Sequence, residues 1–555
     1  MKYSKIALLV SSVMFATGAY ASNTNTANVD QDGTNNIASV TQQVNSDNNT
    51  ANVDQDGADN QATITQANTS QTTGSITQDG IGNQGTISQH DATQTASGSI
   101  TSVGDGNIAN IEQRFFNGAG ASAVITQDGD TNNADIMQDN GDGAVSIIDQ
   151  NGTGDTAKIN NYLSDYADAT ITQNIGGGND AFIDQQISDG ASATITQTGD
   201  SNDGDILQNT SNFAYSANGS DTVATLIQDG SGNRGDIQQI GESSDAHVMQ
   251  TGIFNQADVL QNGFDNTADV DQDGSSNIVS VTQNGTLGMA AVTQTLSSGS
   301  SATVLQEGDS NETDVDQTGT GQTASVTQYD FDNMATVNQS NIGNTATVMQ
   351  SGSTALAMGN AATINQAGDS DTASVTQSGD LNVALVEQNS GSFGNEITVN
   401  QLGNENYAGA ASQLGDMSSI VINQDGDRNT VGGGAAFASG QGWYGAGIGA
   451  GTYGSENLLT VDQTGNDNSA YADSADVSSV VDIDQTGDMN VAAAESWLGT
   501  DNEIMVSQNG TGHFADVYVE GGSLNMVSVT QTDMNNTANV TSLGSNNSVT
   551  IIQGM

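Results

Sequence analysis

The sequence predicts an all-β protein, a β-solenoid of stacked two-strand coils of about 22 residues each, in an amyloid-like cross-β arrangement. Three observations lead to this fold class. A glutamine returns at a nearly constant interval, the residues before it alternate between apolar and polar, and a glycine often follows two positions later. The 555 residues also contain no proline, whose missing N–H would interrupt a long sheet.

The glutamine repeat is clearest between residues 228 and 350. Successive glutamines there are 11 residues apart, with a single interval of 12. Low hydrophobicity with a net charge of −59 would by itself favour disorder. A disordered chain of biased composition has no reason to keep a fixed period, so the repeat predicts regular structure.

Within one unit the residues alternate, as in the segment from Asn266 to Gly274. Ala and Val fall on one face with Asn and Gln, and Asp or Thr falls on the other, which predicts a strand with one buried side. A buried amide without a partner costs about 1–3 kcal/mol. Stacked coils would let each amide donate to one neighbour and accept from the other, whereas a slip of one residue would bury the aspartates. The amides predicted to form these ladders are Gln31, Asn36, Gln42, Gln55, Gln66, Gln228, Gln239, Gln250, Gln261, Asn266, Gln272, Gln283, Gln317, Gln328, Gln339, Asn344 and Gln350.

The glycine that follows each glutamine predicts the turn between strands, because a Cβ would obstruct it. The predicted turn glycines are Gly33, Gly57, Gly230, Gly252, Gly263, Gly274, Gly285 and Gly352.

Four segments are predicted along the chain. Lys2 and Lys5 precede an apolar stretch, and Ala19-Tyr20-Ala21 is a typical cleavage site, so residues 1–21 are predicted to be a signal peptide. The repeats of residues 22–424 form the main solenoid, residues 425–458 are a Gly/Ala-rich insertion, and residues 459–555 continue the solenoid. The apolar stretch within residues 1–21 is too short for a membrane anchor. The absence of cysteine excludes disulfides.

The composition argues against an enzyme or a nucleic-acid-binding protein. A strongly acidic surface repels nucleic acid and anionic lipid. His90, His247 and His513 lie in different repeats and are predicted to be surface residues rather than a catalytic or metal site. No cofactor is expected. Aspartate pairs such as Asp30 and Asp32, or Asp271 and Asp273, leave weak calcium binding open.

The segment from Gln31 to Gln42 has the form Q-x-G-x-x-N-x-A-x3-Q, and on this motif the chain resembles the curlin repeat family. The resemblance implies a secreted subunit of a curli fibre at the cell surface, with roles in biofilm matrix and adhesion. Its implied partners are further copies, other curlin-like subunits, a nucleating subunit and an outer-membrane secretion pore. The chain has many more repeats than the usual major or minor subunit, and its repeats begin near Asn25, so the route of export and the choice between nucleator and major subunit stay open.

The predicted function is templated end-to-end polymerisation. Outward acids such as Asp269 and Asp271 would stack and repel, so we expect faster fibre growth with added salt, calcium or mild acid. The alternative is a monomeric secreted solenoid that acts as an adhesin or binds ice or polysaccharide. Its candidate residues are the outward pairs Thr63 and Thr65, Thr170 and Thr172, and Thr194 and Thr196.

Overall fold

The computed structural model describes residues 24–43, 46–92, 95–115, 120–209, 222–352, 359–432 and 449–554. The predicted signal peptide and residues 433–448 of the predicted insertion lie outside this part of the chain. The described residues form strands, and they include no helix that could cross a membrane. The chain divides into two compact units, Met1–Val270 and Asp271–Met555, with the boundary inside β21 (Thr267–Ser275).

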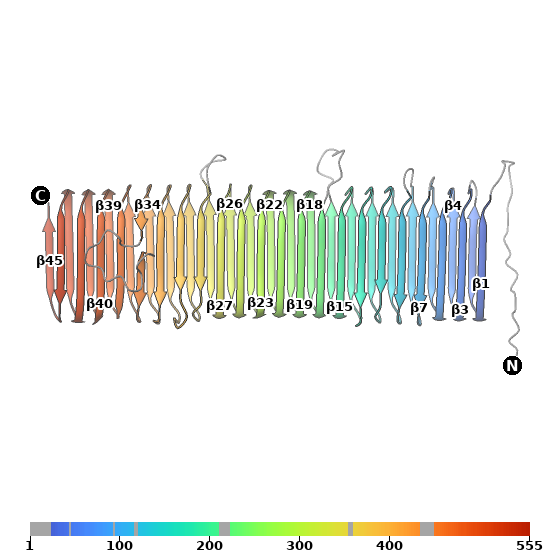
Figure 1. Ribbon diagram of the computed structural model, residues 1–555, viewed down its shortest axis with the longest axis horizontal. Coiled ribbons are helices and arrows are strands. Elements are labelled where there is room, and N and C mark those ends of the chain that lie inside the picture. The colour runs from blue at the N-terminus through green and yellow to red at the C-terminus, as the bar shows by residue number, and fades with distance from the viewer. Residues whose placement is uncertain are drawn as a thin grey trace. The chain divides into compact units, whose positions relative to one another are not determined.

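In unit 1 the chain alternates between two parallel sheets, and each strand pairs with the next strand of its own sheet (Figure 1). Sheet 1A contains β1 (Thr26–Thr34), β3 (Thr50–Ala58), β5 (Thr73–Ile81), β7 (Ser97–Val103), β9 (Ser122–Asp128), β11 (Val145–Gln150), β13 (Asp168–Asn174), β15 (Ser192–Asp200), β17 (Val223–Ser231) and β19 (Asp245–Ile253). Sheet 1B contains β2 (Ile37–Gln43), β4 (Gln61–Ala67), β6 (Gln84–His90), β8 (Ile108–Arg114), β10 (Asn133–Asp139), β12 (Thr156–Tyr162), β14 (Asp180–Gln186), β16 (Asp203–Asn209), β18 (Arg234–Glu242) and β20 (Gln256–Phe264).

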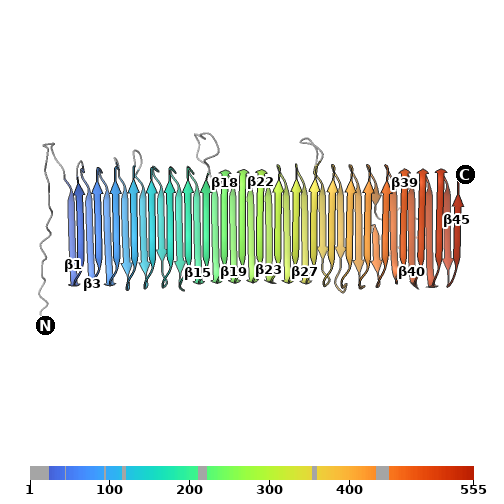
Figure 2. The same cartoon turned by 180° about the vertical axis from the view of Figure 1, so that it is seen from behind.

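Unit 2 has the same construction, which Figure 2 shows from behind. Sheet 2A contains β23 (Met289–Ser298), β25 (Glu312–Thr320), β27 (Met334–Ile342), β29 (Ala361–Gln366), β31 (Val383–Gln388), β33 (Tyr407–Gln413), β35 (Thr430–Val431), β36 (Ala450–Tyr453), β38 (Ser469–Val477), β40 (Val491–Thr500), β42 (Phe514–Ser523) and β44 (Thr537–Leu543). Sheet 2B contains β22 (Ile278–Thr286), β24 (Ser301–Glu307), β26 (Thr323–Tyr329), β28 (Thr345–Ser351), β30 (Thr372–Ser378), β32 (Glu396–Leu402), β34 (Ser419–Asp425), β37 (Leu458–Thr464), β39 (Val480–Asp488), β41 (Glu503–Thr511), β43 (Met526–Met534) and β45 (Ser548–Gln553). The short strands β35 and β36 share one place in sheet 2A, because both pair with β33 and β38.

The pairing is in register, so each repeat position lies beside the same position of the next coil. In β1 and β3, for example, Val29 is opposite Val53 and Gln31 is opposite Gln55. Hydrogen-bonded glutamines of adjacent coils are usually 22 to 25 residues apart in sequence. The predicted fold class, a β-solenoid of two-strand coils, is confirmed.

The core of each unit lies between its two sheets and follows the predicted alternation. In β4 the side chains of Ala62, Ile64 and Gln66 are wholly buried, whereas those between them are half-buried on the outer face. Each buried Ile or Val contributes about 1.5–3 kcal/mol. Gly74 of β5 faces this core, and a Cβ there would lie 3.0 Å from Cγ2 of Ile64 on β4 of the opposite sheet. The two sheets therefore approach closely enough to exclude water.

The turn glycines are required by the approach of one coil to the next. Seven of the eight predicted glycines have a positive φ; at Gly57 it is +109°, and a Cβ would lie only 2.1 Å from the carbonyl oxygen of Gly80 in the following coil. Gly352 differs, because it follows the end of β28 and a Cβ there would meet no atom closer than 3.5 Å.

We expect Gly57→Ala to destabilise unit 1 by about 1–3 kcal/mol, because the new Cβ meets a backbone oxygen and alanine disfavours this φ. The matched control is Gly352→Ala, whose Cβ would meet its nearest neighbour, Asp330 Cβ, at an ordinary van der Waals distance of 3.5 Å. The midpoint of denaturant unfolding measures both variants. Equal midpoints for the two would contradict this account of the turns.

Candidate functional site: the buried amide ladders

In each sheet, glutamines of adjacent coils form runs of side-chain hydrogen bonds, and a run is interrupted where another residue takes the position, as Asn161 does in sheet 1B. Gln55 Nε2 donates to Gln78 Oε1 at 2.8 Å in sheet 1A, and Gln66 Nε2 donates to Gln89 Oε1 at 2.9 Å in sheet 1B. All four side chains are 0–1% exposed. In every such bond the donor belongs to the earlier coil and the acceptor to the later one, so the ladders have a direction along the stack.

The second amide hydrogen of each glutamine binds the opposite sheet. Gln55 donates to the carbonyl of Ile37 at 3.2 Å, and Gln89 donates to the carbonyl of Thr73 at 3.1 Å. The carbonyl group of each acceptor belongs to the first residue of its strand. Gln55 thus satisfies both N–H groups and its oxygen while it joins the two sheets. The prediction from sequence did not include this bond between the sheets.

The structure places the predicted ladder glutamines on these chains. Gln31 and Gln42, in the first coil, are half-buried and donate to Gln55 and Gln66. In sheet 2B the chain is unbroken from Gln283 to Gln553. The remaining predicted glutamines lie buried at the same positions: Gln228, Gln239, Gln250, Gln261, Gln272, Gln317, Gln328, Gln339 and Gln350.

The predicted asparagines occupy a separate column at the turns, and they bond mainly to the backbone. Asn36 Oδ1 accepts the backbone N–H of Asn60 at 3.1 Å, and its Nδ2 donates to the carbonyl of Gly57 at 3.3 Å. Asn344 has the same pair of bonds, to the N–H of Asp371 and the carbonyl of Gly368. Asn266 is buried, and its N–H lies 3.4 Å from Ser244 Oγ. The shorter asparagine side chain therefore caps the turn.

Other residues replace glutamine in parts of the ladders. Ser102 of β7 donates from Oγ to Gln127 Oε1 at 3.0 Å. In sheet 2A the ladder position after β31 is held by smaller residues, which are buried in register across β33 to β44. These residues are Ser412, Thr452, Ser474, Ser496, Val519 and Ser542.

The histidines lie apart. His247 is outward-facing, and its Nδ1 lies 3.1 Å from Asp269 Oδ1. The prediction of a surface position was wrong for His513, which is 1% exposed because it takes an asparagine position in the turn column. Its N–H donates to Asn490 Oδ1 at 3.1 Å, and its Nδ1 accepts the N–H of Asn536 at 3.3 Å. The described residues contain no group of three or more His, Asp or Glu side chains that could hold a metal ion.

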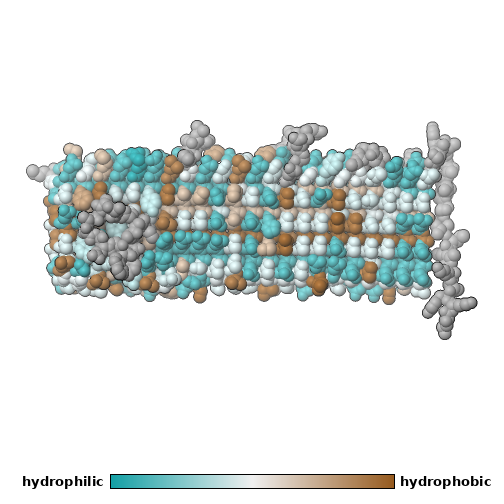
Figure 3. All heavy atoms as spheres, viewed as in Figure 1, coloured by the Kyte–Doolittle hydropathy of each residue, from teal (hydrophilic) through white to brown (hydrophobic). Residues whose placement is uncertain are grey.

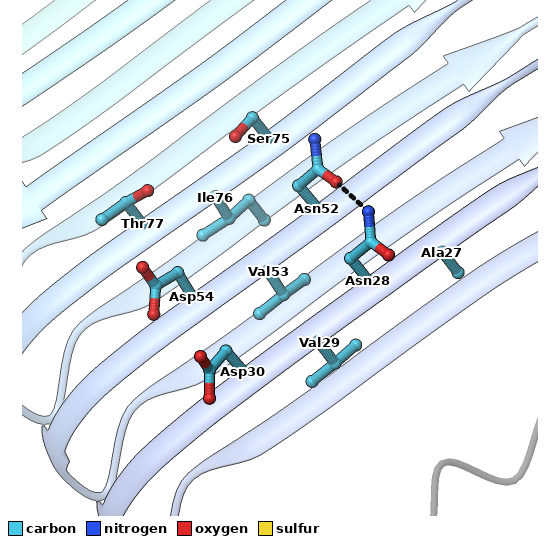
Figure 4. A pocket seen from close by; sticks show the side chains of 10 residues that line it. All are labelled: Ala27, Asn28, Val29, Asp30, Asn52, Val53, Asp54, Ser75, Ile76 and Thr77. Atoms are coloured by element: carbon cyan, nitrogen blue, oxygen red, sulfur yellow. Dashed lines mark hydrogen bonds between the residues drawn. The ribbon is translucent and has the colours of Figure 1, made fainter.

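A pocket of about 680 Å³ lies over β1, β3 and β5 in unit 1 (Figure 4). Asn28 Nδ2 donates to Asn52 Oδ1 at 2.9 Å, and the carboxylates of Asp30 and Asp54 lie at equivalent positions of adjacent strands. None of the ten lining residues is a histidine, lysine or arginine.

The outer face of sheet 2A contains a buried acid pair that alternation in the sequence did not predict. Asp473 of β38 and Glu495 of β40 are opposite each other in register and 1% exposed. Burial and the nearby Glu495 carboxylate raise the pKa of Asp473 to about 7. Burial, together with Asp516, raises the pKa of Glu495 to about 7, against the opposing hydrogen bond from Trp497.

Five segments of the chain match the curlin associated repeat family: residues 23–57, 255–285, 298–329, 368–392 and 499–532. The chain is a curlin-repeat protein. The matched segments lie in both units, and each contains glutamines of the ladders described above. No curated protein matches the chain.

In this curlin-repeat protein, Gln239→Leu should destabilise unit 1 by about 1–3 kcal/mol for each buried partner left unbonded. Gln239 accepts from Gln208 at 2.9 Å and donates to Gln261 at 2.9 Å. Gln238→Leu, one residue earlier on the outer face of β18, is the matched control. Denaturant midpoints compare the two, and equal losses would contradict the ladder as a stabilising element.

The stability of unit 2 should fall as the pH rises through about 7. Asp473 and Glu495 have higher pKa values in the folded state than an exposed carboxyl, so folding binds protons and the advantage is lost when they ionise. Thermal unfolding of the chain, measured at pH values below and above 7, tests this loss of stability. Asp473→Asn should flatten the pH dependence, and an unchanged profile would count against the acid pair as its source.

Proposed function

We propose that this curlin-repeat protein is the structural subunit of an extracellular amyloid fibre in which copies add end to end. The observation that carries the proposal is the complementarity of its two terminal coils. Among the described residues, β1 and β2 each have one partner strand in their sheets, and so do β44 and β45. Unpaired strand edges are templates for a further chain.

The terminal strands match in sequence. Thr537-Ala538-Asn539-Val540 of β44 repeats Thr26-Ala27-Asn28-Val29 of β1. The same four residue types already pair in register within the chain, where β1 lies beside β3. A second copy could therefore place its β1 beside β44 and its β2 beside β45, with Ala and Val side chains continuing the core.

The ladder ends are also complementary. In the last coil Gln553 Nε2 donates to the carbonyl of Thr537 at 2.8 Å, which leaves one amide hydrogen for a further acceptor. Buried Ser542 Oγ has no hydrogen-bond partner among the residues that the structure describes. In the first coil the Oε1 atoms of Gln31 and Gln42 face the edge opposite to their own donor bonds. Ser542 and Gln553 of one copy would then donate to Gln31 and Gln42 of the next, as Ser102 donates to Gln127 within the chain.

This direction favours head-to-tail growth, because two first coils would bring acceptor against acceptor. The wider roles in the proposal follow from the family: export of the chain, a place in biofilm matrix and surface adhesion, and assembly with other curlin-like subunits, a nucleator and a secretion pore. The Asp205 carboxyl supports the expected effect of mild acid. Burial and its neighbours Asp203, Asp236 and Asp180 raise its pKa to about 6, so protonation would relieve repulsion on the outer face.

Purified chain without residues 1–21 should sediment as fibres that bind thioflavin and are visible by electron microscopy. Gln553→Glu removes the free amide hydrogen and should slow growth about tenfold, the effect of about 1.4 kcal/mol. Gln43→Glu adds the same charge on the outer face of β2 and is the control. A chain that stays monomeric would contradict the proposed function, and fibre growth of Gln553→Glu at the control rate would contradict the proposed pairing of ends.

A second candidate function is binding of a neutral polysaccharide, and it is favoured by the outer face of sheet 2B. In Figure 3 hydrophilic and intermediate residues cover most of the visible surface, so polarity alone does not distinguish one face. Across β22 to β30 of sheet 2B, however, a single carboxylate, Glu307, occurs among the outward positions. One column of hydroxyl residues crosses these strands and β32 in register: Ser280, Thr303, Ser325, Thr347, Ser374 and Thr398. The threonine pairs predicted from sequence lie on sheets 1A and 1B and do not form one face.

If this face binds an uncharged glucan, the purified chain should sediment with insoluble cellulose. Ser325→Asp should weaken that binding about tenfold, a loss of about 1.4 kcal/mol, because it places a charge in the hydroxyl column. Thr336→Asp on β27 of sheet 2A is the matched control. Equal binding of the two variants would exclude this face as the binding surface.

A further inference from the structure

One position in the turn column of unit 1 carries an acid in place of an amide. The column precedes the strands of sheet 1B, and each member accepts the backbone N–H of the next. Asp155 N–H donates to Asn132 Oδ1 at 3.0 Å, and Asn179 N–H donates to Asp155 Oδ1 at 3.0 Å. Asp155 therefore occupies an asparagine position, and its side chain is 0% exposed.

The amide nitrogen of each asparagine in this column has a fixed role. Asn132 Nδ2 donates to the carbonyl of Gly152 at 3.0 Å, and Asn179 Nδ2 donates to the carbonyl of Gly199 at 2.8 Å. In both cases the acceptor is a turn residue of the next coil. The equivalent acceptor for Asp155 is the carbonyl of Gly176.

The second carboxyl oxygen of Asp155 lies where that amide nitrogen would be, and it has no hydrogen-bond partner. A Cβ on Gly152 would lie 2.3 Å from Asp155 Oδ2 and 2.7 Å from the Gly176 oxygen, so both oxygens face the same small space. An ionised carboxylate would place two acceptors against each other there, away from water. A buried charge without a hydrogen bond costs far more free energy than a buried neutral group without one.

We propose that Asp155 is a neutral carboxylic acid in the folded unit, and that its Oδ2–H donates to the Gly176 carbonyl. The proton then replaces the amide hydrogen that every neighbouring rung supplies. Folding of unit 1 takes up this proton from solution, since Asp155 ionises readily in an unfolded chain. The rung is therefore lost when the pH rises above the pKa of the buried acid.

The surroundings favour the neutral form. Burial raises the pKa of Asp155, the Asn179 hydrogen bonds oppose this, and the Asp200 carboxylate raises it further. Asp130 of the preceding coil contacts this turn through its carbonyl, which accepts the N–H of Gly154, while its carboxylate accepts the N–H of Asp105 at 2.8 Å. The basic side chain of the adjoining strand, Lys158, lies 5.7 Å from the centroid of the Phe182 ring on the outer face.

Unit 2 contains an internal comparison. Asp371 is also 0% exposed at an asparagine position, and its Oδ1 accepts the N–H of Asn395 at 2.9 Å. Its Oδ2, however, accepts the hydroxyl of Ser392 at 2.6 Å. The single hydroxyl hydrogen of Ser392 also has the Asn389 carbonyl within reach at 2.8 Å. Ser392 nevertheless gives Asp371 Oδ2 a hydrogen-bonding neighbour of a kind that Asp155 Oδ2 lacks among the described residues.

The test compares the full chain with Asp155→Asn, Asp371→Asn and Asp130→Asn at neutral pH. A buried protonated carboxyl has an infrared C=O stretch separate from that of a carboxylate. Asp473 and Glu495 also contribute to this band near pH 7. We therefore expect the band to weaken in Asp155→Asn and to keep its full intensity in the other two variants. Asp155→Asn restores the usual rung, so its thermal midpoint should vary less with pH than that of the unaltered chain.

Two results would overturn the proposal. One is a protonated-carboxyl band of the same intensity in the unaltered chain and in Asp155→Asn. The other is a pH dependence of the thermal midpoint that Asp155→Asn leaves unchanged while Asp371→Asn removes it. The infrared band reports on protonation directly, so a loss of stability in any variant does not obscure the answer.

Discussion

The structure depends on the bonding requirement of a buried primary amide. A glutamine side chain inside the solenoid has two hydrogens and an oxygen to satisfy, and no water to satisfy them. Gln55 meets all three needs only because Gln31, Gln78 and the Ile37 carbonyl lie at matching heights. This requirement sets the register of every strand, because a shift by one residue would leave the amides in solvent and bring the outer residues into the core.

The glutamine ladders keep their hydrogen bonds where additional residues separate two consecutive coils. Gln197 bonds to Gln228 across 31 residues, Gln339 bonds to Gln366 across 27, and Gln424 bonds to Gln463 across 39, yet the bonds remain 2.8–2.9 Å long. In the first two cases the additional residues fall between two strands, where closure of a longer loop costs little additional entropy. In the third case they fall between β35 and β36, which share one place in sheet 2A, and the pairing on both sides keeps the register of β33 and β38.

The sequence predicted the solenoid because its period and alternation are local properties that one strand displays by itself. The hydrogen bonds between the sheets could not be predicted from the sequence, because the repeat period does not indicate which carbonyl faces Gln55. Burial of His513 and Glu495 was also missed. In the sequence both residues are exceptions to the repeat pattern. The pattern does not show that His513 takes an asparagine position, or that Glu495 lies on a buried part of the outer face.

Stability and assembly draw on the same directional bonds under the proposed function. Along an unbroken ladder, each interior glutamine accepts a hydrogen bond from the coil before it and donates one to the coil after it. Among the described residues, Gln553 has an amide hydrogen with no glutamine acceptor, and Gln31 has an amide oxygen with no glutamine donor. A chain with more coils has a larger core to offset these two unpaired groups, but it still has both of them. Length therefore stabilises the single molecule, and only a second copy completes its ladders.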